Sequence, residues 1–305
     1  MPEGHTIHRL AARHRRLFAG DAVTVSSPQG RFTAGAARLT GRTFVDTEAY
    51  GKHLLHHFDS GLALHVHLGL YGRVADGVPP APDPVGQVRM RMESRRHWLD
   101  LRGPAACEVL DPARVSVLRS RLGADPLRDD ADPGVFSDSP RRPKDQAPVS
   151  GSAAAYAAVA NSRRPIFALL LDQAIVAGCG LIYANEVLFR AGLAPTTPGR
   201  EISERCWSEL WDDLRALMKE GVARGRIDTV HTAHTPEAMG RAPRMDRHGG
   251  EVYVYRRPGQ SCLVCGTQVS RDSMAGRNLY WCPVCQPSIV SPSPRARRRS
   301  SSAPR

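Results

Sequence analysis

The first eighteen residues carry apolar and basic side chains at the spacing of an amphipathic helix. The apolar positions of this segment are Ile7, Leu10, Ala11, Leu17 and Phe18. An α-helix has about 3.6 residues per turn, so positions at these intervals share one face, and most of the arginines between them fall elsewhere. The pattern predicts a helix of about four turns that ends at Gly20.

Residues 21–110 change to short runs of β-type residues between Gly, Pro and Asp. Several short strands separated by turn residues are typical of a sandwich or a barrel. The predicted strands are Ala22–Val25, Arg42–Val45, His53–Phe58, Leu62–Val66, Val88–Met92 and Trp98–Leu101.

Histidines are frequent in these predicted strands. They are His53, His56, His57, His65 and His67. They alternate along the strands with no carboxylate partner nearby, so we interpret them as ordinary sheet residues rather than metal ligands.

After residue 110 the pattern becomes helical. Helical period covers Pro112–Leu122, Ile166–Ala177, Ile182–Ala191 and Ser203–Val222, while Arg128–Ser152 has the composition of a linker or loop. The turn Gly178-Cys179-Gly180 joins two of the predicted helices. Such a turn can aim backbone N–H groups at a phosphate, and it is also an ordinary helix connection, so both interpretations stay open.

Two CxxC pairs near the C-terminus have the spacing of a metal site. Sixteen residues separate the second pair from the first, and the four cysteines are Cys262, Cys265, Cys282 and Cys285. Four thiolates at this spacing predict one structural Zn²⁺ that closes a small ribbon around a β-hairpin. Arg277 follows a glycine near the tip of that hairpin, where a guanidinium is suited to grip a phosphate.

The net charge of the chain indicates which classes of partner it binds. Lys and Arg number 42 against 30 Asp and Glu, a net charge of +12, which favours nucleic acid or an acidic membrane surface. No apolar run approaches the ~18–20 residues that span a bilayer, and the N-terminus lacks a signal-peptide pattern. We expect a monomer in the bacterial cytoplasm, associated with the nucleoid. The Ser-, Pro- and Arg-rich tail at 288–305 is expected to be disordered.

The opening residues Met1-Pro2-Glu3-Gly4 suggest a catalytic role for the N-terminus. Removal of Met1 would leave Pro2 with a free secondary amine, a nucleophile that forms an iminium with an aldehyde-like carbon. Glu3 offers a carboxyl for acid–base work beside it. Many chains begin Met-Pro without such a role, so this interpretation depends on the rest of the chain.

Four motifs, in this order, resemble the Fpg/Nei family of bifunctional DNA glycosylases. They are Met1-Pro2-Glu3-Gly4, Gly51-Lys52-His53-Leu54, Leu169-Leu170-Leu171-Asp172-Gln173 with Gly178-Cys179-Gly180-Leu181-Ile182-Tyr183, and Gly276-Arg277-Asn278-Leu279-Tyr280-Trp281-Cys282-Pro283-Val284-Cys285. The resemblance implies an α+β fold with an N-terminal helix and β-sandwich (1–122), a helix–two-turns–helix domain (123–250) and a zinc ribbon (251–287). Damaged double-stranded DNA would lie in the cleft between the domains.

The resemblance also implies roles for individual residues. Pro2 would attack C1′ of the damaged nucleotide while Glu3 assists base departure and ring opening. Lys52 would contact phosphate and serve β-elimination, and Arg277 would hold the lesion phosphate and assist δ-elimination. Arg121 matches a further DNA contact of the family.

The stretch Gly69-Leu70-Tyr71 occupies the loop that fills the void left by the everted base. Leu70 and Tyr71 are suitable apolar wedges, although they could equally be core residues at a strand end. Leu-Tyr resembles the Nei branch, which prefers oxidised pyrimidines. Preference for oxidised purines is the alternative.

One position departs from the family. Leu181 stands where the family usually has an Asn that contacts the DNA backbone, and Asn185, one helical turn later, is the candidate to supply that contact. Two other function classes remain, a non-catalytic DNA-binding zinc protein on the same scaffold and an RNA-binding zinc-ribbon protein. The joint presence of Pro2, Glu3, Lys52 and Arg277 argues against both.

Overall fold

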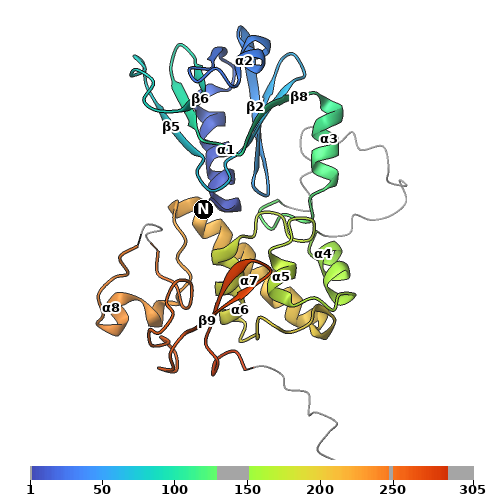
Figure 1. Ribbon diagram of the computed structural model, residues 1–305, viewed down its shortest axis with the longest axis vertical. Helices are drawn as coiled ribbons and strands as arrows, with labels where there is room; N and C mark the ends of the chain where they lie inside the picture. The colour runs from blue at the N-terminus through green and yellow to red at the C-terminus, as the bar shows by residue number, and fades with distance from the viewer. Residues whose placement is uncertain (1, 129–150, 247–249, 288–305) are drawn as a thin grey trace, which may run out of the picture.

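The computed structural model describes residues 2–128, 151–246 and 250–287. Two bodies are stacked along the longest axis, and a two-stranded hairpin packs against the lower one (Figure 1). The upper body, the sandwich domain, contains the eight-stranded sheet and the N-terminal helix α1 (Gly4–Phe18). The chain begins at the junction of the two bodies (Figure 1). The predicted α+β fold is confirmed.

The sheet is antiparallel throughout, and its strand order is β5-β7-β6-β1-β2-β3-β4-β8. The strands are β1 (Ala22–Ser26), β2 (Arg42–Tyr50), β3 (His53–Phe58), β4 (Ala63–His67), β5 (Arg73–Gly77), β6 (Val88–Glu93), β7 (Trp98–Arg102) and β8 (Ala106–Leu110). All six predicted strands are present. The two unpredicted strands, β5 and β8, are the edges of this order, where less apolar surface is buried and the alternating pattern is therefore weak. A short helix, α2 (Thr33–Leu39), was also not predicted.

The helix α1 forms part of the sandwich core. Ile7 and Phe18 are 1% and 0% exposed, and they pack with apolar residues of seven strands, among them Phe44 and Leu64. The helix ends at Phe18, close to the predicted Gly20, whose φ of +85° suits glycine. Because α1 is fixed by this core, the residues at its start have a defined position.

The other helices are α3 (Pro112–Ser120), α4 (Gly151–Ala160), α5 (Ile166–Leu170), α6 (Leu181–Arg190), α7 (Glu204–Arg224) and α8 (Pro236–Met239). α7 begins after the Ser203 side chain, which accepts a hydrogen bond from Cys206 N, and it ends at Gly225 with φ +74°. Most of these helices, with residues 252–255 and parts of the hairpin unit, bury one common core.

The predicted helix Ile166–Ala177 is wrong in its second half, because α5 ends at Leu170. Residues 173–177 bond outside the helix instead. Gly123 N donates to Gln173 O at 2.9 Å, and Ala177 N donates to Ala124 O at 2.8 Å. Pairing with residues 123–124 therefore replaces helical hydrogen bonds and leads the chain into the turn at 178–180.

The C-terminal unit is the predicted hairpin of β9 (Ser270–Met274) and β10 (Arg277–Trp281). Its two-residue turn has φ of +51° at Ala275 and +68° at Gly276, the geometry that suits the twist of a tight hairpin. The turn places Arg277 at the first position of β10. Most of the predicted linker at 128–152 and the tail at 288–305 lie outside the described residues. None of the described helices has both the length and the apolarity to cross a membrane.

The histidines of the sheet have closer carboxylate neighbours than the sequence indicated. His57 Nε2 lies 3.3 Å from Glu48 Oε2, and His65 Nδ1 lies 3.1 Å from Glu108 Oε1. Within the described residues, only the four cysteines form a cluster of potential metal ligands, so no such site involves these histidines.

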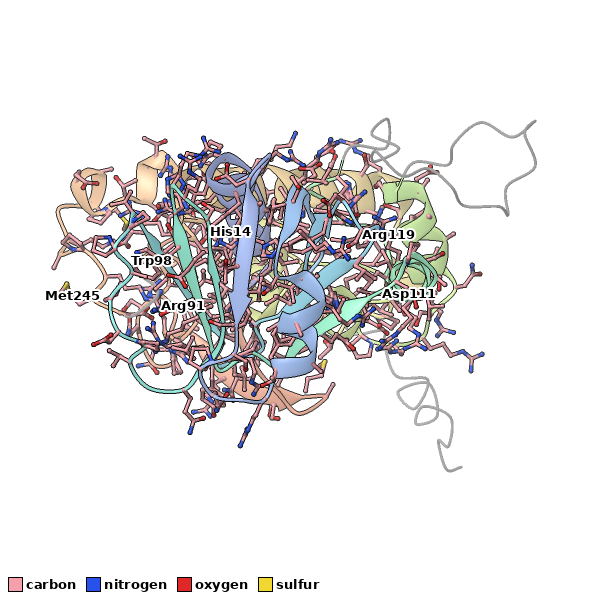
Figure 2. The ribbon with its side chains drawn as sticks, turned by 90° about the horizontal axis from the view of Figure 1, so that it is seen from above. His14, Arg91, Trp98, Asp111, Arg119 and Met245 are labelled. Carbon is pink, nitrogen blue, oxygen red and sulfur yellow. The ribbon has the colours of Figure 1, made fainter. Side chains whose placement is uncertain are left out.

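A buried pair of histidines, His14 and His56, links α1 to the sheet, and Figure 2 labels His14 in its view from above. Nδ1 of His14 lies 2.9 Å from Nε2 of His56, and both side chains are in the sandwich core. Burial lowers the pKa of His14 to about 4, and it lowers the pKa of His56 well below its usual range. Both rings are therefore neutral in the folded protein near neutral pH.

We expect the sandwich domain to lose stability in mild acid. An unfolded histidine takes up a proton near pH ~6.5, whereas folded His14 does so only near pH 4. Between these values the unfolded state binds more protons, so the free energy of unfolding falls on acidification by up to ~1.4 kcal/mol per pH unit for each such histidine. The free energy of unfolding can be measured by denaturant titration at several pH values in this range. Plotted against pH, it should change less steeply for His14→Gln than for the parent or for His97→Gln. Equal slopes in all three proteins would contradict this origin.

Candidate active site

Glu3 is the N-cap of α1, and its carboxylate is completely buried at the start of another helix. Oε1 accepts a hydrogen bond from Ile182 N at 2.8 Å, and Oε2 lies 3.5 Å from Tyr183 N. These N–H groups begin α6, where the helix dipole favours a negative charge. The first turn of α6 thus binds a carboxylate of the protein itself. The sequence had left open that these N–H groups bind a phosphate.

The protonation of Glu3 is set by opposing effects. Burial raises its pKa, while Lys52 and the two N–H groups act in the opposite direction, and the net shift is upward. A carboxyl with a raised pKa retains a protonated fraction closer to neutral pH. Glu3 can therefore both donate and accept a proton beside Pro2, which is half-buried.

Glycines allow the segments around Glu3 to approach closely. Gly4 N donates to Gly178 O at 2.9 Å. A Cβ at Gly180 would lie 2.3 Å from Cδ of Glu3, and a Cβ at Gly4 would lie 2.9 Å from Cα of Gly178. A larger residue at either glycine would therefore displace the carboxylate or the start of α1.

Lys52 enters the same site from the turn between β2 and β3. Its ammonium donates to the carbonyl of Cys179 at 2.8 Å. Burial lowers the pKa of Lys52, and the nearby charge of Glu3 opposes that shift. The structure thus brings Glu3 and Lys52 together at the junction of the two bodies.

Arg277 is the first residue of β10 in the hairpin unit. Its side chain is exposed, and among the described residues it forms no hydrogen bond or ion pair. Its charge is near enough to lower the pKa of Lys52. Arg277 is therefore available to an anionic ligand.

The four cysteines fit one zinc ion. Their Sγ atoms all lie within 4.8 Å of one another, with 3.8 Å between Cys262 and Cys285 and 3.4 Å between Cys265 and Cys282. Tetrahedral Zn–S bonds of ~2.3 Å require sulfur atoms about 3.8 Å apart. These cysteines hold the metal, which cross-links the two ends of the hairpin unit. With four protein ligands, the site is structural rather than catalytic.

The comparisons with known proteins cover almost the whole chain. Residues 1–107 match the formamidopyrimidine-DNA glycosylase N-terminal domain, residues 141–232 the formamidopyrimidine-DNA glycosylase H2TH domain, and residues 259–287 the zinc finger found in FPG and IleRS. The chain is 46% identical over 290 residues to Endonuclease 8 1 of Mycobacterium tuberculosis (strain H37Rv), covering 94% of this chain and 100% of the relative. It belongs to the Fpg/Nei family of DNA glycosylases.

More distant members agree. The chain is 31% identical over 294 residues to a formamidopyrimidine-DNA glycosylase of Thermus thermophilus, covering 94% of this chain and 98% of that relative. The fold is shared with Lactococcus lactis Fpg in complex with DNA containing an abasic site. That likeness has a TM-score of 0.71 at 20% identity, over 94% of this chain and 100% of the other. As a member of this family, the protein is a DNA glycosylase with abasic-site lyase activity.

In this glycosylase, Asn185 has a structural role. The side chain is 1% exposed, Nδ2 donates to Leu181 O at 2.7 Å, and Oδ1 accepts from Tyr280 N at 2.7 Å. Its amide group therefore attaches α6 to β10, and its contact with DNA stays a prediction. Leu181, partly buried against the helical core, does not replace the polar contact of the family's Asn.

Leu70 and Tyr71, the two candidates for the apolar wedge, are both exposed, as a side chain that enters DNA must be. Leu70 is 62% exposed and Tyr71 81% exposed, on the turn between β4 and β5. The alternative that they pack in the core at a strand end is therefore wrong. Arg121, just after α3, is also exposed. Nothing in the structure places these three residues on DNA.

Sequence reasoning missed Glu186, a fully buried carboxylate on α6. It accepts hydrogen bonds from Tyr253 N at 2.6 Å, Val254 N at 2.9 Å and Tyr255 N at 2.7 Å. It thereby fixes the segment that leads into the zinc unit. The nearest of these partners in sequence is 67 positions away, so no local pattern could indicate the role.

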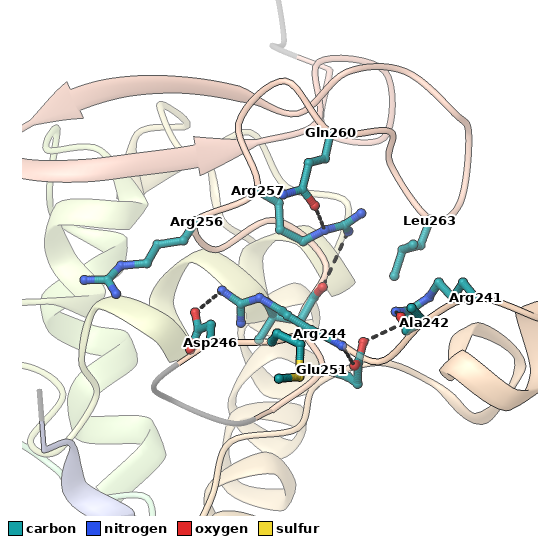
Figure 3. Close-up of a pocket in the computed structure, with 11 residues that line it drawn as sticks. Arg241, Ala242, Arg244, Asp246, Glu251, Arg256, Arg257, Gln260 and Leu263 are labelled. Atoms are coloured by element: carbon teal, nitrogen blue, oxygen red, sulfur yellow. Dashed lines mark hydrogen bonds and ion pairs between the residues drawn. The ribbon is translucent and has the colours of Figure 1, made fainter.

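A polar pocket lies where this segment meets the zinc unit (Figure 3). Its basic residues are Arg241, Arg244, Arg256 and Arg257. Arg244 donates to Asp246 Oδ2 at 2.6 Å, and Arg257 donates to Gln260 Oε1 at 3.1 Å and Tyr253 O at 2.6 Å. Because Arg241, Arg244 and Arg257 each donate to a backbone carbonyl beside the pocket, we interpret the pocket as a structural joint outside the active site.

Loss of zinc should release the hairpin without unfolding the sandwich. We expect Cys262→Ser to bind no zinc and to lose amide-exchange protection across β10, because the small unit has too little core of its own. Arg277→Ala is the matched control, and it should keep both zinc and protection. Zinc analysis with hydrogen-exchange mass spectrometry measures both effects. Retained protection of β10 in metal-free Cys262→Ser would show that packing alone holds the hairpin.

Proposed function

We propose that this glycosylase removes oxidised pyrimidines from double-stranded DNA through a Schiff base formed by Pro2, and then cleaves the strand by β- and δ-elimination. It would act at the bacterial nucleoid. The observation that carries the proposal is the buried carboxylate of Glu3 immediately beside Pro2, held by the α6 N-terminus and approached by Lys52.

The first step is displacement of the base. The Pro2 amine bonds to C1′ with its electron pair, the bond from C1′ to the base breaks, and the departing base takes up the proton that the amine loses. Glu3, whose pKa is raised by burial, supplies a proton for ring opening, which converts the adduct into an iminium. The fixed start of α1 supports this role, because it holds the amine and the carboxyl in adjacent positions.

The second step is strand cleavage. The iminium acidifies the C2′ proton, and its removal expels the 3′ phosphate; a second elimination expels the 5′ phosphate. Burial lowers the pKa of Lys52, so a larger neutral fraction is available to act as a base. The exposed Arg277 would hold the lesion phosphate from the opposite side of the junction.

Two observations support a preference for pyrimidines: the name of a similar protein and the residues of the candidate wedge loop. The protein with 46% identity is named Endonuclease 8 1, and Leu70-Tyr71 would fill the void left by the everted base. Arg121 would contact the DNA backbone nearby. A non-catalytic DNA-binding role is less well supported, because such a protein has no need of a buried acid beside its N-terminal amine.

A blocked N-terminus should abolish covalent chemistry. We expect borohydride to trap the mature protein on an abasic duplex, since reduction of the iminium makes the link permanent. A protein that retains an extra residue before Pro2 has an amide in place of the amine and should form no adduct, while its DNA affinity changes little. The assay is a gel shift under denaturing conditions. Equal trapping of both proteins would exclude Pro2 as the nucleophile.

The lesion preference is tested with matched duplexes. We expect faster single-turnover excision of thymine glycol than of 8-oxoguanine, with an abasic duplex of the same sequence as the control for lyase activity. A faster rate on 8-oxoguanine would favour the alternative, an oxidised-purine glycosylase. Cleavage of the abasic duplex alone would leave a lyase without the proposed glycosylase specificity.

A further inference from the structure

Asp125 is a buried carboxylate at the junction of the sandwich and the helices. Its side chain is 0% exposed. It lies between the two segments, 1–107 and 141–232, that match the family domains. A carboxylate in such a place costs free energy unless donors surround it, so its partners indicate what it does.

Three donors from three parts of the chain converge on Asp125. Oδ2 accepts from His8 Nε2 at 2.8 Å and from Gly51 N at 2.7 Å, and Oδ1 accepts from Leu127 N at 2.9 Å. His8 belongs to α1, the helix that begins directly after Glu3. Gly51 directly precedes Lys52. One carboxylate therefore connects the two elements that carry the acid and the amine of the site.

The turn at Gly51 has little freedom to move. Its φ is +56°, and a Cβ there would lie 3.0 Å from both Ala177 Cβ and Gly178 N. Tyr50, one residue earlier, donates its hydroxyl hydrogen to Gly123 O at 3.0 Å. The turn is thus held against residues 123–125 on one side and residues 177–178 on the other.

Residues 123–124 are in turn bonded to the chain that leads into the 178–180 turn. Ala124 N donates to Ile175 O at 3.1 Å, and Ala177 N donates to Ala124 O at 2.8 Å. That turn supplies the Cys179 carbonyl that receives the Lys52 ammonium and the Gly178 carbonyl that receives Gly4 N. Asp125 is therefore bonded to the backbone segments that surround Glu3 and Lys52.

We propose that Asp125 is a positioning residue, which sets the distance between the carboxyl of Glu3 and the ammonium of Lys52 through His8 and Gly51. The inference rests on the roles proposed above for those two residues. The hydrogen bonds of Asp125 go to His8, Gly51 and Leu127, so it acts through its neighbours and takes no part in the chemistry. Its effect is on the rate of reaction in bound DNA rather than on DNA affinity.

The requirement is for a carboxylate and not merely for a polar group. An Asn at this position has one acceptor oxygen. If that oxygen takes the place of Oδ2, the amide hydrogens face Leu127 N; in the other orientation they face Gly51 N. Either way a buried donor loses its acceptor, and the turn or the following segment must shift. A shift of about 1 Å in reacting groups can lower a rate by ~10²-fold.

The test is single-turnover cleavage of an abasic duplex by Asp125→Asn, with the dissociation constant of the same duplex measured in parallel. We expect the rate to fall at least ~10-fold while the dissociation constant changes less than ~3-fold, as for a group that acts on placement. The control is Asp100→Asn. Asp100 is also a buried carboxylate of the sandwich with three donors, from Arg91 and Arg102, but it lies away from the site. It should lower the melting temperature and leave the rate within about twofold of the parent.

Two further variants keep the proposal testable if Asp125→Asn does not fold. His8→Gln retains a donor toward Asp125 and should cleave faster than His8→Ala, which has none; both change a partly exposed side chain. Equal rates for this pair, or a parent-like rate for folded Asp125→Asn, would overturn the inference while leaving the proposed function intact. A parent protein that does not cleave the abasic duplex would refute the proposed function instead.

Discussion

The contact on which the structure depends is the burial of the Glu3 carboxylate at the N-terminus of α6. It joins the first residues of the sandwich domain to the helical body, and it does so with a charge-assisted bond of 2.8 Å from Ile182 N. The cost of burying a carboxylate is partly offset by the N–H groups and the helix dipole. The remaining cost raises the pKa of Glu3, which is the property that an acid–base group beside an amine requires.

The rest of the junction serves to keep that contact in place. Glycines at positions 4, 51 and 178 let three backbone segments meet. Two other buried carboxylates fix more distant parts, because Glu186 holds the segment before the zinc unit and Asp125 holds the turn before Lys52. The zinc site then lets a short hairpin carry Arg277 without a core of its own. Each of these three buried carboxylates is thus satisfied by backbone from another element.

The sequence was informative where a signal is local. The amphipathic first helix, the six central strands, the paired cysteines and the N-terminal motif each depend on neighbouring residues, and all are present as expected. Edge strands β5 and β8 and the early end of α5 were missed, because they depend on pairing partners that are distant in sequence. The same limit applies to Asn185. Its hydrogen bond to β10 could not be predicted, because the partner lies 95 positions away.

In the proposed reaction the N-terminal amine, and not the buried amine of Lys52, forms the covalent link to DNA. Both are nucleophilic amines in one site, so peptide mapping distinguishes them directly. The borohydride-reduced complex with an abasic duplex is digested with nuclease and protease, and the modified peptide is identified by mass spectrometry. We expect the nucleotide remnant to be attached to the peptide that begins with Pro2. A remnant on the peptide that contains Lys52 would contradict it.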